Sequence, residues 1–146
     1  MNFFTLQRNV ERVAENFTEL VLESAMANKE VIADLNVQQL EEGKRIDGNS
    51  IIPEYQIDVY AKAKKSIGAK PPLYTPDLKF KGYFHAGIYA DQKSNYIYTY
   101  SSDEKADKLN SKYRKIFGLT FDSKVYFKQI LLDELLKRTR DELHKG

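Results

Sequence analysis

The chain has 146 residues, of which 42% are hydrophobic and 30% charged, as in a globular domain with a buried core and unlike a disordered chain. It contains no cysteine, which excludes disulfides and thiolate metal sites, and its net charge is only +2. Its first residues lack a basic start followed by an apolar run, and no apolar stretch approaches the roughly 20 residues that span a bilayer. We therefore expect a single domain, 1–146, without a signal peptide or membrane contact.

Residues 1–43 are predicted to be helical. Apolar residues recur at three- and four-residue steps from Leu6 to Val21, with glutamates on another face. A second, shorter periodic stretch runs from Val31 to Leu40 and is ended by Gly43. The two stretches predict an antiparallel helical pair, or one long helix broken near Asn28.

A turn-rich loop is predicted at 44–54, because Asp47-Gly48-Asn49 is a strong turn signal and Pro53 prevents a helix from running through. A helix and a proline-rich loop follow at 55–76. The helix is expected over Glu54–Ile67, and the loop after it contains three of the four prolines.

The periodicity then changes to strict alternation, which predicts an antiparallel β-hairpin over 85–101. One strand is expected at His85–Asp91 and the other at Asn95–Ser101, with the turn at 91–94. Three tyrosines of the second strand share one face: Tyr96, Tyr98 and Tyr100. We expect this face to be at least half covered, because an isolated hairpin is marginal in water and must pack on helices or on another chain.

Helices are predicted over 103–143. A short polar helix at Asp103–Lys115 precedes a long one at Asp122–Leu143, which we expect to pack on the N-terminal helix around Val10–Val21. The apolar stripe of the long helix consists of Val125, Ile130, Leu131, Leu135 and Leu136. Together the elements predict an α+β fold with an N-terminal helical pair, a short antiparallel β-hairpin or small sheet, and a long C-terminal helix.

The sequence offers no constellation of catalytic or metal-binding residues. Its two histidines, His85 and His144, lie in very different contexts, and no glycine-rich phosphate loop or Gly-x-Ser-x-Gly turn is present. Neighbouring carboxylates such as Glu41-Glu42 and Asp133-Glu134 fall on polar helix faces, where solvated groups do no acid–base work. We expect neither enzyme activity nor a cofactor.

Nucleic-acid binding is the alternative function. Lysines gather between Lys62 and Lys81, and the tyrosine face would let bases stack as on single-strand-binding sheets. The candidate interface residues are Lys62, Lys64, Lys65, Tyr96, Tyr98 and Tyr100. Against this interpretation, the basic stretch is poor in arginine, and alternating tyrosines are also typical of a hairpin that packs against helices.

Charge is distributed unevenly along the sequence. Residues 1–43 carry 3 basic and 8 acidic groups, a net of −5. Residues 44–81 carry 8 and 4, a net of +4, and residues 82–146 carry 12 and 9, a net of +3. These charges attract one another within the fold, or between neighbouring subunits of a ring that meet head to tail.

The order of these features resembles that of the small virion-morphogenesis, tail-completion or neck (head–tail junction) proteins of tailed bacteriophages. The resemblance covers residues 35–143, and four segments carry it: Ile46–Pro53, Tyr55–Lys65, Asp77–Phe84 and Tyr113–Thr120. The last segment is similar to the Arg-x-Phe-Leu-Gly-Leu-Ser stretch that some members have before their final helix. The chain departs from the pattern at Phe80-Lys81-Gly82, where members often have Thr-Gly.

The resemblance implies a structural subunit of the virion, made in the host cytoplasm, which acts in head–tail joining or tail assembly without enzyme activity. The implied partners are identical copies in a ring at the neck or tail-completion position, together with other neck, portal or tail proteins. Contact with DNA would be non-specific.

Overall fold

The computed structural model of the chain describes residues 2–79 and 81–146. Phe80, part of the segment Asp77–Phe84, lies outside the described residues. The fold is α+β, as predicted. Its elements in chain order are α1 (Phe3–Glu15), α2 (Phe17–Met26), α3 (Lys29–Glu41), α4 (Asp58–Ser66), α5 (Tyr83–Ala86), β1 (Ile88–Lys93), β2 (Tyr96–Ser101), α6 (Ala106–Lys112) and α7 (Phe121–Leu143).

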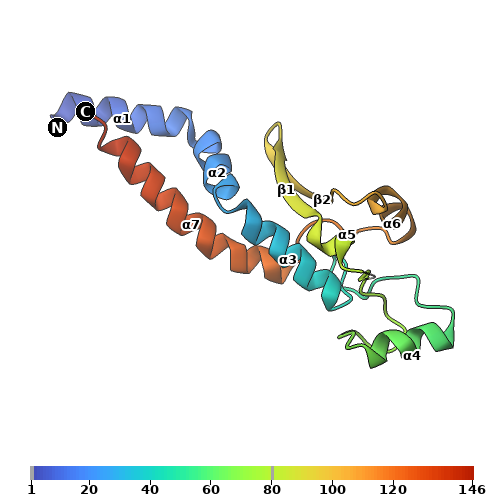
Figure 1. The fold of residues 1–146 in the computed structure, drawn as a ribbon. Helices are drawn as coiled ribbons and strands as arrows, with labels where there is room; N and C mark the ends of the chain where they lie inside the picture. The colour runs from blue at the N-terminus through green and yellow to red at the C-terminus, as the bar shows by residue number, and fades with distance from the viewer. Residues whose placement is uncertain (1, 80) are drawn as a thin grey trace.

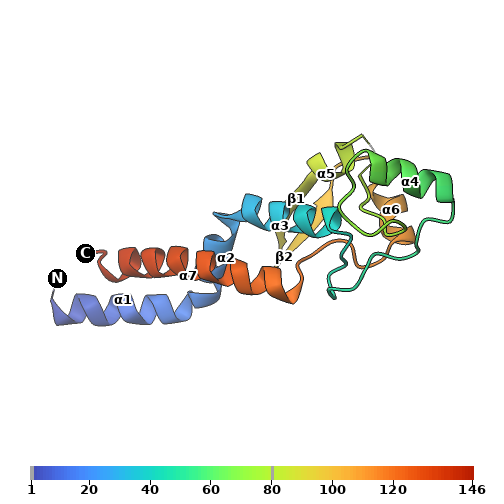
Figure 2. The same ribbon diagram turned by 90° about the horizontal axis from the view of Figure 1, so that it is seen from below.

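The molecule is elongated, with a helical arm at one end and a mixed head at the other (Figures 1 and 2). We define the arm as α1 and Phe17, the first residue of α2 (Phe17–Met26), together with residues 132–143 of α7, and the head as α3 to α6 with the two strands. The two termini lie close together at the tip of the arm (Figure 1). The first three helices follow one another end to end, and α7 runs back beside them (Figures 1 and 2).

The N-terminal segment therefore contains three helices that do not fold back into an antiparallel pair. The predicted break near Asn28 is present, and a second break lies at Asn16, where the backbone leaves helical geometry. The Asn16 side chain donates a hydrogen bond to the Arg12 carbonyl at 3.0 Å, in addition to the bond of 3.1 Å from the Asn16 backbone amide to the same oxygen. The antiparallel partner of this segment is α7, which periodicity alone does not identify.

The hairpin is shifted relative to the prediction. β1 and β2 pair antiparallel from Ile88 opposite Ser101 to Lys93 opposite Tyr96, so the turn is Ser94-Asn95 and not 91–94. His85 and Ala86, which were expected to begin the first strand, lie in the short helix α5. His85 is held there by a contact of 2.8 Å between its Nε2 and the Asp77 carbonyl oxygen.

The face of the hairpin that packs on helices is not the tyrosine face. Helix α3 lies against β1, and Ile88, Ala90, Thr99 and Ser101 are the buried residues of that side. Because side chains alternate along a strand, the tyrosines lie on the outer face.

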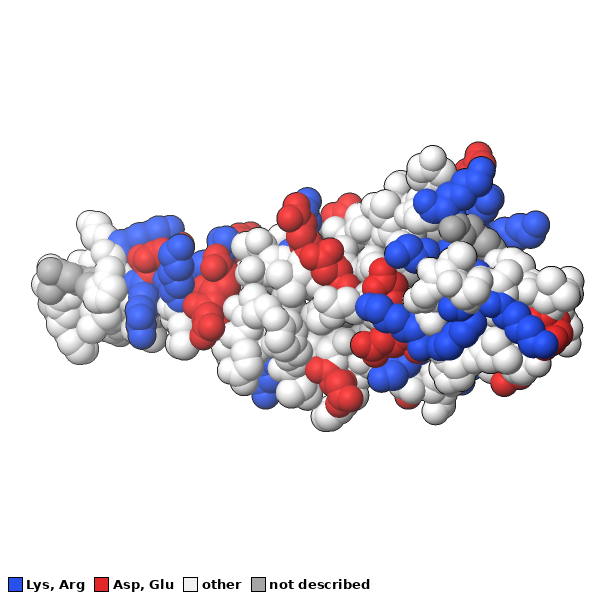
Figure 3. All heavy atoms as spheres, turned by 60° about the horizontal axis from the view of Figure 1, so that its bottom comes forward, with Lys and Arg blue, Asp and Glu red and all other residues white. Residues whose placement is uncertain are grey.

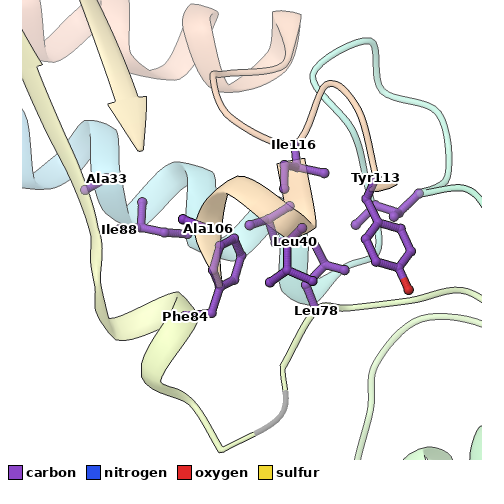
Figure 4. Close-up of a cluster of buried hydrophobic side chains, with 10 residues drawn as sticks. Ala33, Leu40, Leu78, Phe84, Ile88, Ala106, Tyr113 and Ile116 are labelled. Carbon is purple, nitrogen blue, oxygen red and sulfur yellow. The ribbon is translucent and has the colours of Figure 1, made fainter. Parts of the chain in front are cut away.

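A main core fills the head. Leu40 and Ile51 are completely buried and pack with Leu78, Phe84 and Ile116, residues from distant parts of the sequence (Figure 4). Gly43 ends α3 in the left-handed region, with φ of +74°, and a Cβ there would lie 2.8 Å from a Pro71 carbon. Glycine is therefore required both for the turn and for the close approach of the proline-rich loop.

The predicted packing of α7 on Val10–Val21 is only partly correct. Ile130 and Leu131 pack with the buried Phe127 against a second core that includes Ala25 and Ile32, so this half of α7 contacts α2, α3 and the hairpin. The predicted stripe residues Val125 and Leu136 are about half exposed. Phe127 is buried in their stead, because it lies on the side of α7 that faces the head.

Other element ends differ by a few residues. Helix α4 begins at Asp58 instead of Glu54, and α6 is shorter at both ends than Asp103–Lys115. Helix α7 begins at Phe121, where the Thr120 hydroxyl caps it by accepting a hydrogen bond from the Ser123 amide at 3.2 Å. The turn at 47–49 is present, and the Asp47 side chain accepts a hydrogen bond from the Asn49 amide at 3.0 Å.

Candidate functional site

The structure separates the three lysines that were grouped as a candidate interface. Lys64 is buried, with its side chain 8% exposed and its Nζ 2.7 Å from Asp77 Oδ1. Lys62 is exposed and pairs with Asp58 one turn away, at 2.8 Å. Lys65 donates to the carbonyl oxygens of Ala69 at 3.1 Å and Pro71 at 2.8 Å, and so holds the proline-rich loop. Lys64 is therefore not an interface residue, because the buried carboxylate of Asp77 needs its charge.

The tyrosine face is partly covered. The Tyr100 ring packs against Phe117 with a centroid separation of 4.5 Å, and its hydroxyl donates to the Asp107 carboxylate, which raises the pKa of Tyr100. Tyr98 is half-buried edge-on against Tyr89, and loss of solvent raises its pKa. Tyr96 is 50% exposed. The expectation that at least half of this face is covered thus holds for Tyr98 and Tyr100.

The lysines and the tyrosines are not brought to one surface. Helix α4, which carries Lys62, lies apart from the strands in both ribbon views (Figures 1 and 2). On the face drawn in Figure 3, basic side chains gather over the head and the arm carries both signs of charge. A continuous groove with stacked bases and paired phosphates would need the two sets side by side.

Acidic helices and basic loops meet within the chain. Glu41 of α3 lies 3.6 Å from the Lys70 ammonium and 3.8 Å from that of Lys79, and Glu23 of α2 lies 3.6 Å from the guanidinium of Arg138. Some acidic groups of residues 1–43 therefore pair with basic groups from later in the same chain, and not with a neighbouring subunit.

His85 is the one buried histidine among the described residues. Its Nε2 contacts the Asp77 carbonyl, whereas its Nδ1 has no hydrogen-bond partner and lies 3.9 Å from Glu41 Oε1. Burial lowers the pKa of His85, because the imidazolium would lose its hydration. Across residues 2–79 and 81–146, no cluster of three or more His, Asp or Glu side chains is arranged to hold a metal ion.

No family model, curated protein or solved structure matches this chain. In the part of the chain that the structure describes, every helix is too short or too polar to cross a bilayer.

The arm carries a row of large apolar side chains that are exposed to water. On the first two helices the exposed fractions are 71% for Phe3, 50% for Val10 and 50% for Phe17. On α7 they are 39% for Leu132 and 55% for Leu136. Contiguous exposed apolar side chains, as opposed to scattered ones, are typical of interaction surfaces.

The two helices of the arm are joined by polar contacts. Asn9 is 1% exposed, and its amide nitrogen donates to the Leu143 carbonyl at 3.0 Å. The guanidinium of Arg12 donates to the Glu142 carbonyl at 3.1 Å and lies 3.3 Å from the Glu142 carboxylate. The apolar stripe of α1 therefore contributes little to its contact with α7.

Sequence reasoning assigned the apolar stripe of α1 to the core and missed it as a candidate surface. The signal that could have indicated this is the spacing of Phe3, Leu6, Val10, Val13 and Phe17, with steps of three and four residues. Such spacing is that of a coiled-coil seam, which packs against another helix.

Proposed function

We propose that this chain is a structural subunit that acts by assembling with copies of itself, in a ring at the neck or tail-completion position of a tailed-phage virion. The observation that carries the assembly function is the apolar side of the arm, which the other residues that the structure describes leave uncovered. The virion setting rests on the resemblance of residues 35–143 to phage neck and tail-completion proteins.

The physical argument is the cost of leaving such a surface in water. The Phe3, Val10 and Phe17 side chains are 50% to 71% exposed, although burying apolar surface is the main favourable term in folding and association. A subunit that buries this surface only on assembly gains that stabilisation at the interface. An elongated shape with separate arm and head suits a protomer that touches several neighbours.

Single-stranded nucleic-acid binding is the less favoured function. Lys64 is enclosed with Asp77. Lys62 and Lys65 are exposed, but Lys62 is paired with Asp58 and Lys65 is engaged with carbonyl groups of the proline-rich loop. The half-exposed Tyr96 is the part of the tyrosine face left for stacking.

Size-exclusion chromatography with light scattering, followed by negative-stain electron microscopy, tests the proposal. We expect closed oligomers of one size, visible as rings, and no measurable affinity for a fluorescent single-stranded oligonucleotide. A monomer at high protein concentration that binds the oligonucleotide with a steep salt dependence would overturn the assembly function in favour of nucleic-acid binding.

A further inference from the structure

Two apolar stripes run along the arm, one on each helix. The stripe of α1 extends from Phe3 to Phe17, the first residue of α2, in alternating steps of three and four residues. The stripe of α7 continues the pattern with steps of four and three: Leu132, Leu136, Thr139 and Leu143. Sustained spacing of this kind keeps a seam on one side of a helix that packs in a bundle.

Both stripes lie on the same side of the arm. Asn9 and Arg12 mark the side of α1 that faces α7, and Arg138 and Glu142 mark the side of α7 that faces α1 and α2. At 3.6 residues per turn, the middle of each stripe lies roughly 100° around its helix axis from these residues. In both helices the rotation is in the direction in which the chain winds toward its C-terminus. Because the helices run antiparallel, equal rotations bring the two stripes to one common side.

The opposite side of the arm is charged. Arg8 and Glu15 of α1, and Lys137 and Asp141 of α7, are exposed there. The arm is thus half of a bundle. One side is mainly charged, with Phe4 as an exposed apolar residue, and the other side is apolar and without a cover among the described residues.

We propose that the apolar side of the arm is covered by the same side of a second copy, so that two arms form a four-helix bundle. This inference rests on the proposed function and names one of its contacts, the one that pairs two copies. A contact between identical sides joins only two subunits, so the ring closes through a second, different interface. Six side chains are at least 39% exposed on this side: Phe3, Leu6, Val10, Phe17, Leu132 and Leu136. Each presents on the order of 100 Å², so one arm offers on the order of 600 Å², close to the ~800 Å² that each partner buries in a standard protein interface.

The charges of the arm favour a second copy over a lipid surface. Helices that lie on membranes carry an excess of lysine and arginine on their polar face. Helix α1 has two arginines and two glutamates, so it is electrically balanced. The apolar stripes themselves contain no charged residue, and hence no like charges meet when one copy packs on another.

The test compares two double variants by light scattering across a concentration series. Val10→Glu with Leu136→Glu places carboxylates in the apolar side, and Arg8→Glu with Lys137→Glu is the matched control on the charged side. All four positions are exposed, so both variants are expected to fold, which circular dichroism and thermal unfolding verify. We expect the first variant to weaken self-association at least about tenfold, because a carboxylate is strongly disfavoured in an apolar contact, and the control to associate like the parent chain.

The outcomes separate this inference from the proposed function. Equal association of both variants and the parent chain would overturn the arm contact and leave assembly through another surface. A parent chain that is monomeric throughout would overturn both. A monomer that co-sediments with phosphatidylglycerol vesicles, and loses this binding in V10E/L136E, would assign the apolar side to a lipid surface instead.

Discussion

Lys64 and Asp77 form an ion pair that is almost completely removed from water. Their side chains are 8% and 6% exposed, and the Lys79 amide donates a further hydrogen bond to Asp77 Oδ1 at 3.0 Å. Replacing Lys64 with Met would leave a buried carboxylate without a counter-charge, and we expect a loss of about 3–5 kcal/mol in the free energy of unfolding. Urea denaturation measures this loss.

The matched control is Lys62→Met, which removes the exposed pair with Asp58. Surface pairs contribute between about 0 and 1 kcal/mol, so the control should be close to the parent chain. Equal losses in the two variants would contradict the different environments of these lysines.

His85 should make stability depend on pH. Burial lowers its pKa in the folded chain below the ordinary value of 6.5. As the pH falls through about 6.5, the unfolded chain takes up a proton that the folded chain accepts only at lower pH, so stability is lost on acidification and is level above that range.

Urea midpoints measured between about pH 7.5 and pH 5 test this dependence. We expect His85→Gln to reduce the slope near pH 6.5 and the exposed His144→Gln to retain it. An unchanged slope in His85→Gln would show that other groups cause it.

At the scale of elements, Asn36 ties helix α3 to the hairpin and to the linker before α7. It is fully buried, and its Oδ1 accepts from the Thr99 hydroxyl at 2.6 Å and from the Gly118 amide at 3.1 Å. Its amide nitrogen donates to the Ile116 carbonyl at 2.9 Å. Asn36→Leu would leave these buried groups without hydrogen-bond partners. We expect a loss of about 2–4 kcal/mol in the free energy of unfolding, measured by urea denaturation. The exposed Gln38→Leu should change stability by less than about 0.5 kcal/mol.

Phe127 is the anchor of α7 on the second core. It is 8% exposed and packs in one cluster with Ala25, Ile32 and Ala90. We expect Phe127→Ala to destabilise the chain by about 3–5 kcal/mol in thermal or urea unfolding. Its neighbour Tyr126 is 60% exposed, and Tyr126→Ala is the control that should cost far less. A small loss in Phe127→Ala would mean that α7 docks through other residues.

For the whole molecule, the salt dependence of assembly distinguishes an apolar contact from a charged one. Glu23 and Glu41 already pair with basic groups of the same chain, which leaves fewer acidic groups for a head-to-tail contact. If the arms pack through their apolar sides, association should not weaken when salt rises from about 0.05 to 0.5 M, although screening then becomes much stronger. Light scattering at both concentrations measures this, and marked weakening would indicate contacts between charges.

The elements were more predictable than the candidate site. Alternation over 85–101 and the apolar periodicity of Asp122–Leu143 are local signals, and they located the hairpin and the last helix to within a few residues. The lysines were grouped because they are close in sequence, yet Lys62 and Lys64 point to opposite environments. Nearness along a helix does not decide exposure, since residues two apart face different sides.

The sequence by itself determined the α+β class and the faces of the periodic elements, because periodicity and capping depend on neighbouring residues alone. Only the tertiary structure decided what covers each face. It placed Ile97 and Thr99 toward the helices and the tyrosines outside, put Phe127 in the core, and left the stripe from Phe3 to Phe17 in water. The physical reason is that burial is a property of two packed surfaces, and a periodic pattern describes only one of them.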